Sequence, residues 1–218
     1  MQDDAPAPPV RLDLIRNALA ALGEPGLDPV ANLKEAPKRS SILVPIVELH
    51  GEAAVVVTKR PPTMHHHSND WVFPGGRYHP DDGQAVVTAL REAEEELGFA
   101  RRRTEILGQL TTRGPLLTGY VIEVFVGLVD LGELSPDPRE VADVALLPIG
   151  ALMAPEVYRR SFILPEHIPG PTSTGAVLAP VARNRPLHFF EIRPGEDIWG
   201  TQGDILFELL SAIALAPD

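Results

Sequence analysis

The pattern of apolar and polar residues predicts an N-terminal helix followed by two strands in the first part of the chain. Residues 10–22 place apolar side chains at near-helical spacing and end before Gly23, as a helix does. Residues 41–49 and 53–59 are strand-like runs, and the short segment between them predicts a tight turn. We interpret residues 24–39, which contain proline and glycine, as a connector.

Further apolar runs predict more strands and a final helix. Residues 106–110 form a short run, and residues 121–129 form a near-continuous run that is typical of a central strand. Residues 187–192 predict a late strand after the loop-rich segment 161–186. Residues 202–215 predict a final helix with one apolar face, which comprises Ile205, Leu206, Leu209, Leu210 and Ile213. This mixture of strands with a few helices predicts an α/β sandwich of the α+β kind.

Another helix is predicted in the second half of residues 73–99, which read FPGGRYHPDDGQAVVTALREAEEELGF. Its apolar residues recur at helical spacing, at Val86, Leu90, Ala93 and Leu97. This stripe predicts a helix that is docked on the core. The preceding Phe73-Pro74-Gly75-Gly76 segment predicts a turn in which the backbone approaches a ligand closely.

The same helix carries a cluster of acidic residues, since four of the five residues from 92 to 96 are glutamates. Glu92, Glu95 and Glu96 share one helix face, where their like charges repel. A hard divalent cation such as Mg²⁺ removes this penalty, because it prefers carboxylate oxygens. The glycine turn and this face together predict a site for metal-bound phosphate. The alternative is a solvated acidic face, which is what most glutamate runs are.

The segment resembles the Nudix box, whose pattern is G-x5-E-x7-R-E-U-x-E-E-x-G-U, where U is apolar. The second half of the box is matched at its fixed positions by Arg91, Glu92, Glu95, Glu96 and Gly98. The first half departs from the pattern, because Gly83 stands where the family has glutamate and Arg77 stands where it has glycine. Gly76 lies 15 residues before Arg91, one more than the standard box.

This one-residue insertion resembles a particular branch, the coenzyme A pyrophosphatase-like Nudix hydrolases. The motif that precedes the box in this branch is matched at Thr58, at Arg60 and in the FPGG turn. It is not matched at three positions, which hold Pro61, His65 and Asn69. A Trp-Gly turn at residues 197–201 is also similar, so that the resemblance covers roughly residues 40–215.

The resemblance implies a Nudix fold, in which a mixed β-sheet is sandwiched between α-helices. We expect residues 1–39 to form a tail, a helix and a connector, and residues 40–218 to form the Nudix hydrolase domain. The resemblance also implies Mg²⁺ or Mn²⁺ as the cofactor. The metal ligands would be Glu92, Glu95, Glu96 and the carbonyl of Gly75.

Arg91 would hold a box carboxylate in position through its guanidinium group. Its partner in most of the family is the first-half glutamate, which is absent here, and Asp82 is the natural substitute. Alternatively, Asp81 or Asp82 is a helix N-cap.

The general base would be a glutamate of the box, with Glu95 as the candidate, or a carboxylate from a later loop. Glu140 lies at a matching place before a strand; the alternative is that it pairs with a surface arginine. The remaining candidates bind substrate: Arg60, His65, Gly76 and Arg77.

The net charge of −11 argues against a nucleic-acid-binding surface, which needs a basic footprint. A phosphate substrate then requires a metal and nearby arginines to invert the local field. We interpret the basic triplet at 101–103 as a solvated loop rather than as part of the site.

The chain has no cysteine, which excludes disulfides and thiolate metal sites. No apolar run approaches the ~20 residues of a membrane helix. The acidic, proline-rich residues 1–9 do not resemble a secretory signal. We therefore expect a cytoplasmic protein without a membrane partner, and we leave a homodimer open.

The leading hypothesis is a metal-dependent hydrolase that acts on a small-molecule nucleotide substrate. It would cleave coenzyme A or acyl-CoA to 3′,5′-ADP and 4′-phosphopantetheine. The first alternative keeps the chemistry but has ADP-ribose, NADH or a dinucleoside polyphosphate as substrate, because Pro61, His65 and Asn69 alter the branch motif. The second alternative is a non-catalytic Nudix-fold binding module, because the family's glutamate is absent at Gly83.

Overall fold

The structure is a computed structural model of the 218-residue chain. It describes residues 8–28, 31–32, 37–64, 67–114, 118–130, 132, 134–162, 177–178 and 185–217. His65 and most of the loop-rich segment 161–186 lie outside the described residues.

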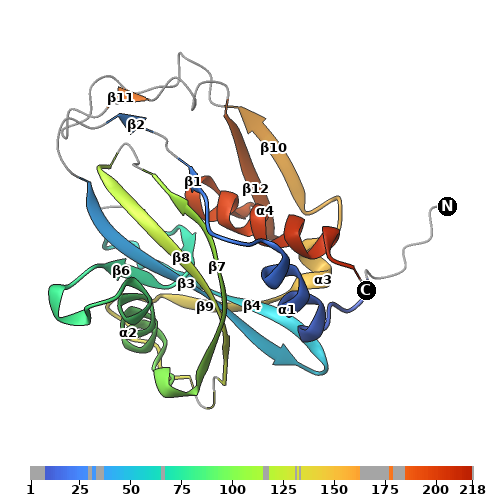
Figure 1. Ribbon diagram of the computed structural model, residues 1–218, viewed down its shortest axis with the longest axis horizontal. Coiled ribbons are helices and arrows are strands. Elements are labelled where there is room, and N and C mark those ends of the chain that lie inside the picture. Colours follow the sequence, from blue (N-terminus) through green and yellow to red (C-terminus); the bar gives the residue numbers. More distant parts are fainter. Residues whose placement is uncertain are drawn as a thin grey trace.

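A mixed β-sheet forms the centre of the molecule (Figure 1). Its strands follow the order β1-β7-β8-β3-β4-β5, while β6 also pairs with β3 and β9 with β4. The bounds are β1 Leu27–Asp28, β3 Lys38–Leu49, β4 Glu52–Lys59, β5 Trp71–Val72, β6 Gly75–Arg77, β7 Thr104–Arg113, β8 Tyr120–Val129 and β9 Asp143–Pro148. The β3–β8 and β1–β7 pairs are parallel and the others are antiparallel. The run 121–129 is therefore central, as predicted.

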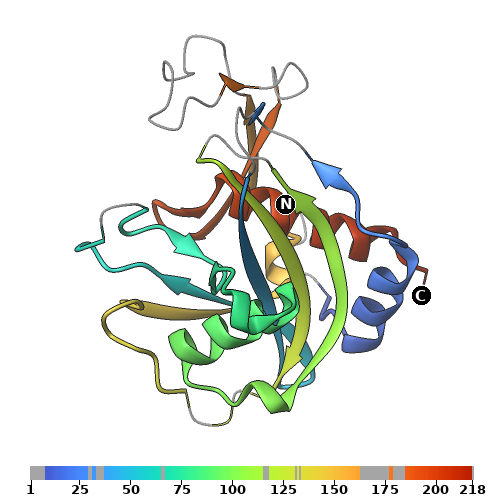
Figure 2. The same cartoon turned by 60° about the vertical axis from the view of Figure 1, so that its left-hand side comes forward.

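Helices cover both faces of this sheet, as Figure 2 shows. Helix α2 (Ala85–Leu97) packs on one face, while α1 (Leu12–Ala21) and α4 (Gly200–Leu215) pack on the other. The short helix α3 (Ile149–Leu152) lies on the side of α4. The predicted α+β architecture, a mixed sheet between helices, is confirmed.

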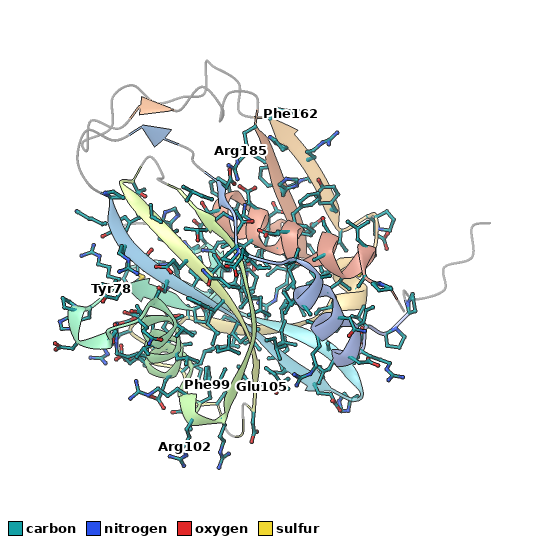
Figure 3. All side chains as sticks on the ribbon, in the orientation of Figure 1. Tyr78, Phe99, Arg102, Glu105, Phe162 and Arg185 are labelled. Carbon is teal, nitrogen blue, oxygen red and sulfur yellow. The ribbon has the colours of Figure 1, made fainter. Side chains whose placement is uncertain are left out.

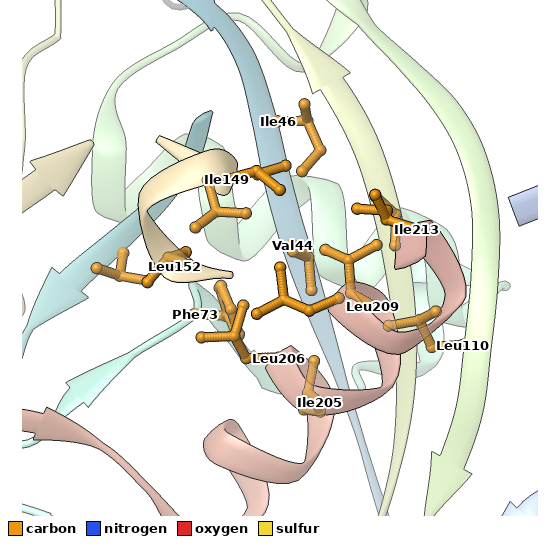
Figure 4. Close-up of a cluster of buried hydrophobic side chains, with 14 of the residues drawn as sticks. Val44, Ile46, Phe73, Leu110, Ile149, Leu152, Ile205, Leu206, Leu209 and Ile213 are labelled. Atoms are coloured by element: carbon orange, nitrogen blue, oxygen red, sulfur yellow. The ribbon is translucent and has the colours of Figure 1, made fainter. Parts of the chain in front are cut away.

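Strand β3 shows why the sheet is buried on both faces. Its residues alternate in direction, so that Val44 and Ile46 join the core under α1 and α4, while Leu43 and Val47 join the core under α2. Figure 4 shows the first of these cores around Val44. The buried residues of α1 contribute to the same core as α4, so the N-terminal helix packs on its own chain.

The turn between β3 and β4 is a tight hairpin, as predicted. His50 and Gly51 have φ angles of 54° and 83°. Positive φ at two successive residues suits the two-residue hairpin turn whose twist matches that of its strands.

A second, smaller sheet lies beside α4 and comprises β10 (Tyr158–Phe162), β12 (Pro186–Arg193) and β13 (Glu196–Ile198). Its middle strand β12 includes the strand predicted at 187–192. Two short pieces, β2 (Ala31–Asn32) and β11 (Val177–Leu178), pair with each other. Two 3₁₀ helices, η1 (Pro80–Asp82) and η2 (Arg101–Arg103), flank α2. In the described part of the chain, no helix is long and apolar enough to cross a membrane.

The apolar stripe predicted on α2 packs against the core at all four positions, but to different depths. Val86 and Leu90 are only partly buried. Ala93 and Leu97 are buried, as are Ala85 and Ala89, which stand one position before Val86 and Leu90. Small alanine side chains let the helix approach the sheet closely, which leaves the larger Val86 and Leu90 at the margin of the contact.

Candidate metal centre and active site

The two glycines of the FPGG turn lie so close to neighbouring atoms that a Cβ atom would overlap with them. Gly75 and Gly76 pair with Ile42 and Ser41 across the β3–β6 ladder. A Cβ atom on Gly75 would lie 2.4 Å from the Ser41 carbonyl oxygen, and one on Gly76 would lie 2.2 Å from the carboxyl carbon of Glu92. Glycine therefore lets β6 come into direct contact with the acidic edge of α2.

Glu96 is the most deeply buried of the predicted carboxylates, with 5% of its surface exposed. The backbone N–H of Gly75 donates to its Oε1 over 3.4 Å. Burial raises the pKa of Glu96 to about 8, and the negative charges of Glu140 and Glu92 also raise it. The N–H of Gly75 and the positive charge of Arg60 lower this pKa but do not cancel the effect of burial. A carboxylate in this environment gains strongly from a nearby cation.

The other two carboxylates are less buried than Glu96. The side chain of Glu92 is 17% exposed and that of Glu95 is 59% exposed. Burial raises the pKa of Glu92, and Arg91 opposes this effect. The three glutamates therefore share one helix edge but differ in depth, from exposed Glu95 to buried Glu96.

Arg91 connects this edge to the 3₁₀ helix before α2. Its Nε and Nη2 atoms donate to the two carboxylate oxygens of Asp82 over 3.0 and 3.1 Å. Its Nη1 atom lies 2.9 Å from Glu92 and 3.1 Å from Glu95. Its Nη2 atom also donates to the carbonyl of Arg77 over 3.3 Å.

Asp82 is held by further contacts within the same turn. It accepts the hydroxyl of Thr88 over 2.8 Å and the backbone N–H of His79 over 3.2 Å. The hydrogen bonds from Arg91 hold the pKa of Asp82 well below its usual range. The N-cap of α2 is Gln84, without a side-chain hydrogen bond, so neither Asp81 nor Asp82 caps that helix.

The carboxylates of Glu92, Glu95 and Glu96 are the kind of ligand that a hard divalent cation prefers, although their oxygen atoms do not converge on one point. Among the described residues, no three histidine, cysteine or acidic side chains converge as a ready metal centre. The reason is visible in the contacts, because Arg91 pairs with both Glu92 and Glu95. The buried carboxylate of Glu96 and that of Glu92 over Gly76 supply the oxygen ligands that Mg²⁺ and Mn²⁺ prefer.

The loop before β9 brings Glu140 to the same site. Backbone hydrogen bonds tie the loop to the end of α2, from Asp137 N–H to the Glu96 carbonyl over 3.1 Å, and to the end of β4, from Ala142 N–H to the Lys59 carbonyl over 2.8 Å. Glu140 is exposed, and within the described residues it forms no ion pair. Its charge raises the pKa of both Glu92 and Glu96, which places it near them.

The predicted substrate-binding residues are distributed around this edge. Arg60 follows β4, and its charge lowers the pKa of Glu96, while its buried Nε has no hydrogen-bond partner in the described part of the chain. Arg77 is exposed and its side chain lies over the ring of Tyr120. Asn69 has a φ of 63°, a left-handed conformation that explains why a glycine fits this position in the branch motif.

The sequence patterns did not predict a set of contacts made by the hairpin of β12 and β13, here called the C-terminal hairpin, and by α4. The carboxylate of Glu196 accepts the indole N–H of Trp71 over 2.7 Å and pairs with Lys59 over 2.6 Å. The side chain of Gln202 accepts the backbone N–H of Phe73 over 3.0 Å. These contacts join β13 and α4 to the FPGG turn and to the strand that precedes Arg60. The Trp-Gly turn at 197–201 was the sequence signal nearest to them.

Comparison with known families agrees with this geometry. A family described as the NUDIX domain matches residues 37–164, which is more than half of the chain. The chain belongs to the Nudix family. The predicted class, a Nudix pyrophosphohydrolase, is therefore confirmed at the level of the family.

Curated relatives include an uncharacterized Nudix hydrolase and a coenzyme A diphosphatase. NudL of Photorhabdus laumondii, an uncharacterized Nudix hydrolase, is 32% identical over 133 residues, which are 60% of this chain and 69% of that protein. The mitochondrial coenzyme A diphosphatase NUDT8 of Homo sapiens is 35% identical over 132 residues, which are 56% of this chain and 53% of that protein. The match therefore spans about half of the human relative's length.

A solved structure of similar fold is the MutT/nudix family protein from Enterococcus faecalis. Its TM-score is 0.51 at 15% identity, over 84% of this chain and 64% of that chain. At this identity the likeness concerns the Nudix fold alone.

Proposed function

We propose that this Nudix protein hydrolyses the diphosphate linkage of coenzyme A or an acyl-CoA and releases 3′,5′-ADP and 4′-phosphopantetheine. The observation that carries the proposal is the contact between the acidic edge of α2 and the glycine turn. There the carboxylate of Glu96 meets the N–H of Gly75, and that of Glu92 lies over Gly76.

A Mg²⁺ or Mn²⁺ ion would be held by Glu92, Glu95, Glu96 and the carbonyl of Gly75. When bound, it neutralises charge on the diphosphate and activates a water molecule. Arg91 holds Glu92 and Glu95 at the helix edge, and Asp82 fixes the guanidinium of Arg91. This chain of contacts supports the assignment of Asp82 as the substitute for the glutamate absent at position 83.

The general base of the proposed reaction is Glu140. It is exposed, it lies near Glu92 and Glu96, and among the described residues it has no cationic partner that would hold it away from water. Glu95 is the alternative, but its carboxylate pairs with Arg91. A carboxylate without a guanidinium partner is free to hydrogen-bond and orient the attacking water.

The choice of coenzyme A rests on the branch motif and on the relatives. Arg60, Gly76 and Arg77 surround the acidic edge, and the human relative that shares 35% identity is described as a coenzyme A diphosphatase. The second candidate substrate class is ADP-ribose, NADH or dinucleoside polyphosphates, which Pro61 and Asn69 motivate because both depart from the branch motif.

Product analysis by mass spectrometry tests the proposal. The purified protein is incubated with Mg²⁺ or Mn²⁺ and with coenzyme A, ADP-ribose, NADH or diadenosine polyphosphates, beside a Glu95→Gln/Glu96→Gln variant. Release of 4′-phosphopantetheine by the unaltered protein alone supports the coenzyme A assignment. Cleavage of another compound instead of coenzyme A would identify that compound as the substrate. Absence of both cleavage and metal binding would support a non-catalytic module.

A further inference from the structure

Three strand ends meet beside the glycine turn and carry a group of cationic and aromatic residues. Strand β3 begins at Lys38, which is in register with Tyr120 at the beginning of β8. On its other side, Ser40 of β3 is in register with Arg77, the last residue of β6. Arg77 directly follows Gly76, so this group lies one residue from the backbone that contacts Glu92.

Lys38 and Arg77 converge on one aromatic ring. The Nζ atom of Lys38 lies 5.7 Å from the centroid of the Tyr120 ring, and the Cζ atom of Arg77 lies 5.8 Å from it. The next residue of β3, Arg39, points to the other side of the strand, where it lies 4.4 Å from the ring of Tyr78. Figure 3 marks Tyr78 beside α2.

Lys38 and Arg77, which lie beside Tyr120, differ in charge balance from Arg39, which lies beside Tyr78. Arg39 pairs with Glu123 over 2.7 Å, so its charge is balanced within the sheet. Lys38 and Arg77 are both exposed cations against the same ring. Two like charges on one ring repel each other, in a chain whose net charge is −11. A bound anion removes that repulsion, as a cation does for the glutamates of α2.

The chemistry of the group specifies the kind of anion. A lysine ammonium and an arginine guanidinium are the common partners of phosphate, and a tyrosine ring offers a flat surface for a nucleotide base. In a nucleoside 3′,5′-bisphosphate, one ribose separates the two phosphates. Arg77 likewise directly follows the glycine turn, where the diphosphate is proposed to lie.

We propose that Lys38, Arg77 and Tyr120 form a subsite for a phosphate monoester on the nucleotide half of the substrate, outside the linkage that is cleaved. The inference rests on the proposed function. It names the residues that would select coenzyme A over ADP-ribose. Coenzyme A carries a 3′-phosphate on its adenosine, and ADP-ribose carries none.

Kinetics with a matched pair of substrates test the subsite. Coenzyme A and 3′-dephospho-coenzyme A differ only in the 3′-phosphate, so the ratio of their kcat/KM values isolates its contribution. Lys38→Ala and Arg77→Ala are each expected to lower this ratio at least about tenfold, as expected for loss of a charge-assisted hydrogen bond. In Lys38→Ala, activity on 3′-dephospho-coenzyme A stays unchanged, and Lys38→Arg retains the ratio.

Arg102→Ala is the matched control, because Arg102 is an exposed arginine in η2 at a different end of the molecule (Figure 3). It is expected to leave the ratio unchanged. If both compounds are cleaved and neither Lys38→Ala nor Arg77→Ala changes the ratio relative to Arg102→Ala, the subsite is refuted while the proposed function stands.

A binding measurement decides the question if neither compound is cleaved. Calorimetric titration compares 3′,5′-ADP with 5′-AMP, without any hydrolysis. The subsite predicts tighter binding of 3′,5′-ADP by the unaltered protein and loss of this preference in Lys38→Ala. Equal binding of the two nucleotides, or binding of neither, would overturn the inference.

Discussion

The guanidinium of Arg91 and the carboxylate of Asp82 face each other through two hydrogen bonds, of 3.0 and 3.1 Å. Asp82 stands one position before the place where the Nudix box has its first glutamate. The 3₁₀ helix at Pro80–Asp82 turns this carboxylate toward α2, so that a shorter acid at a shifted position reaches the same arginine.

Replacement of Asp82 by alanine is expected to lower both stability and metal affinity. The side chain of Asp82 is only 7% exposed, so its loss leaves Arg91 without its main partner and costs about 2 kcal/mol in the free energy of unfolding. Asp81→Ala is the control, since the side chain of Asp81 is 91% exposed. Urea denaturation and Mg²⁺ titration measure the two effects, and equal behaviour of the two variants would contradict the role of Asp82.

Restoring the family's glutamate is not expected to rescue Asp82→Ala. A Cβ atom on Gly83 would contact nothing within 4 Å, and the φ of Gly83 is 69°, which strains any larger residue. The double variant Asp82→Ala/Gly83→Glu should therefore remain as weak in metal binding as the single variant. Recovery of Mg²⁺ affinity in the double variant would show that position 83 reaches Arg91 after all.

The stability of the metal-free protein is expected to fall as pH rises through the range set by Glu96. The pKa of Glu96 is raised from 4.5 to about 8 in the folded chain, so the folded state binds more protons than the unfolded state between these values. Glu96→Gln removes this titrating group and therefore its contribution to the pH dependence of stability. The Tm difference between the two proteins should change between pH 5 and pH 8 by on the order of 5 °C.

The same pKa shift makes metal binding release a proton below about pH 8. Calorimetry of Mg²⁺ binding in buffers of different ionisation enthalpy measures this release directly. A pH-independent Tm difference, together with metal binding that releases no proton, would show that Glu96 is already ionised in the folded protein.

Glu140→Gln is expected to lower kcat by about 10²-fold or more, the range of general base catalysis, and to leave Tm unchanged. The side chain is exposed, so its amide analogue disturbs no packing. Glu156→Gln, also on the surface, is the control. A rate equal to that of the control would remove Glu140 from the mechanism and leave Glu95 as the base.

Glu196→Ala tests the contacts made by the C-terminal hairpin. Loss of the carboxylate removes the contacts that hold Trp71, which precedes the FPGG turn, and Lys59, which precedes Arg60. Even small displacements of reacting groups reduce rates strongly. We expect kcat to fall on the order of tenfold, with partial recovery in Glu196→Gln, which retains an acceptor for Trp71. Unchanged kcat in the alanine variant would limit the hairpin to a structural role.

The sequence by itself determined the strands at 41–49, 53–59 and 121–129, the final helix and the family. These features depend on local periodicity and on a motif contained in one stretch of chain, so they can be read without knowledge of distant residues. The pairing of Asp82 with Arg91 was also accessible, because the insertion and the alternative acid lie within the same motif.

Only the tertiary structure decided how deeply each glutamate of α2 is buried, which face of that helix meets the sheet, and how Glu196 reaches Trp71 and Lys59. Helical spacing places Glu92, Glu95 and Glu96 on one face but does not say what packs against it. The burial of Glu96 depends on β6 and on the loop of Glu140, and the contacts of Glu196 join residues more than a hundred positions apart. Such contacts follow from the packing of distant segments, which no local pattern encodes.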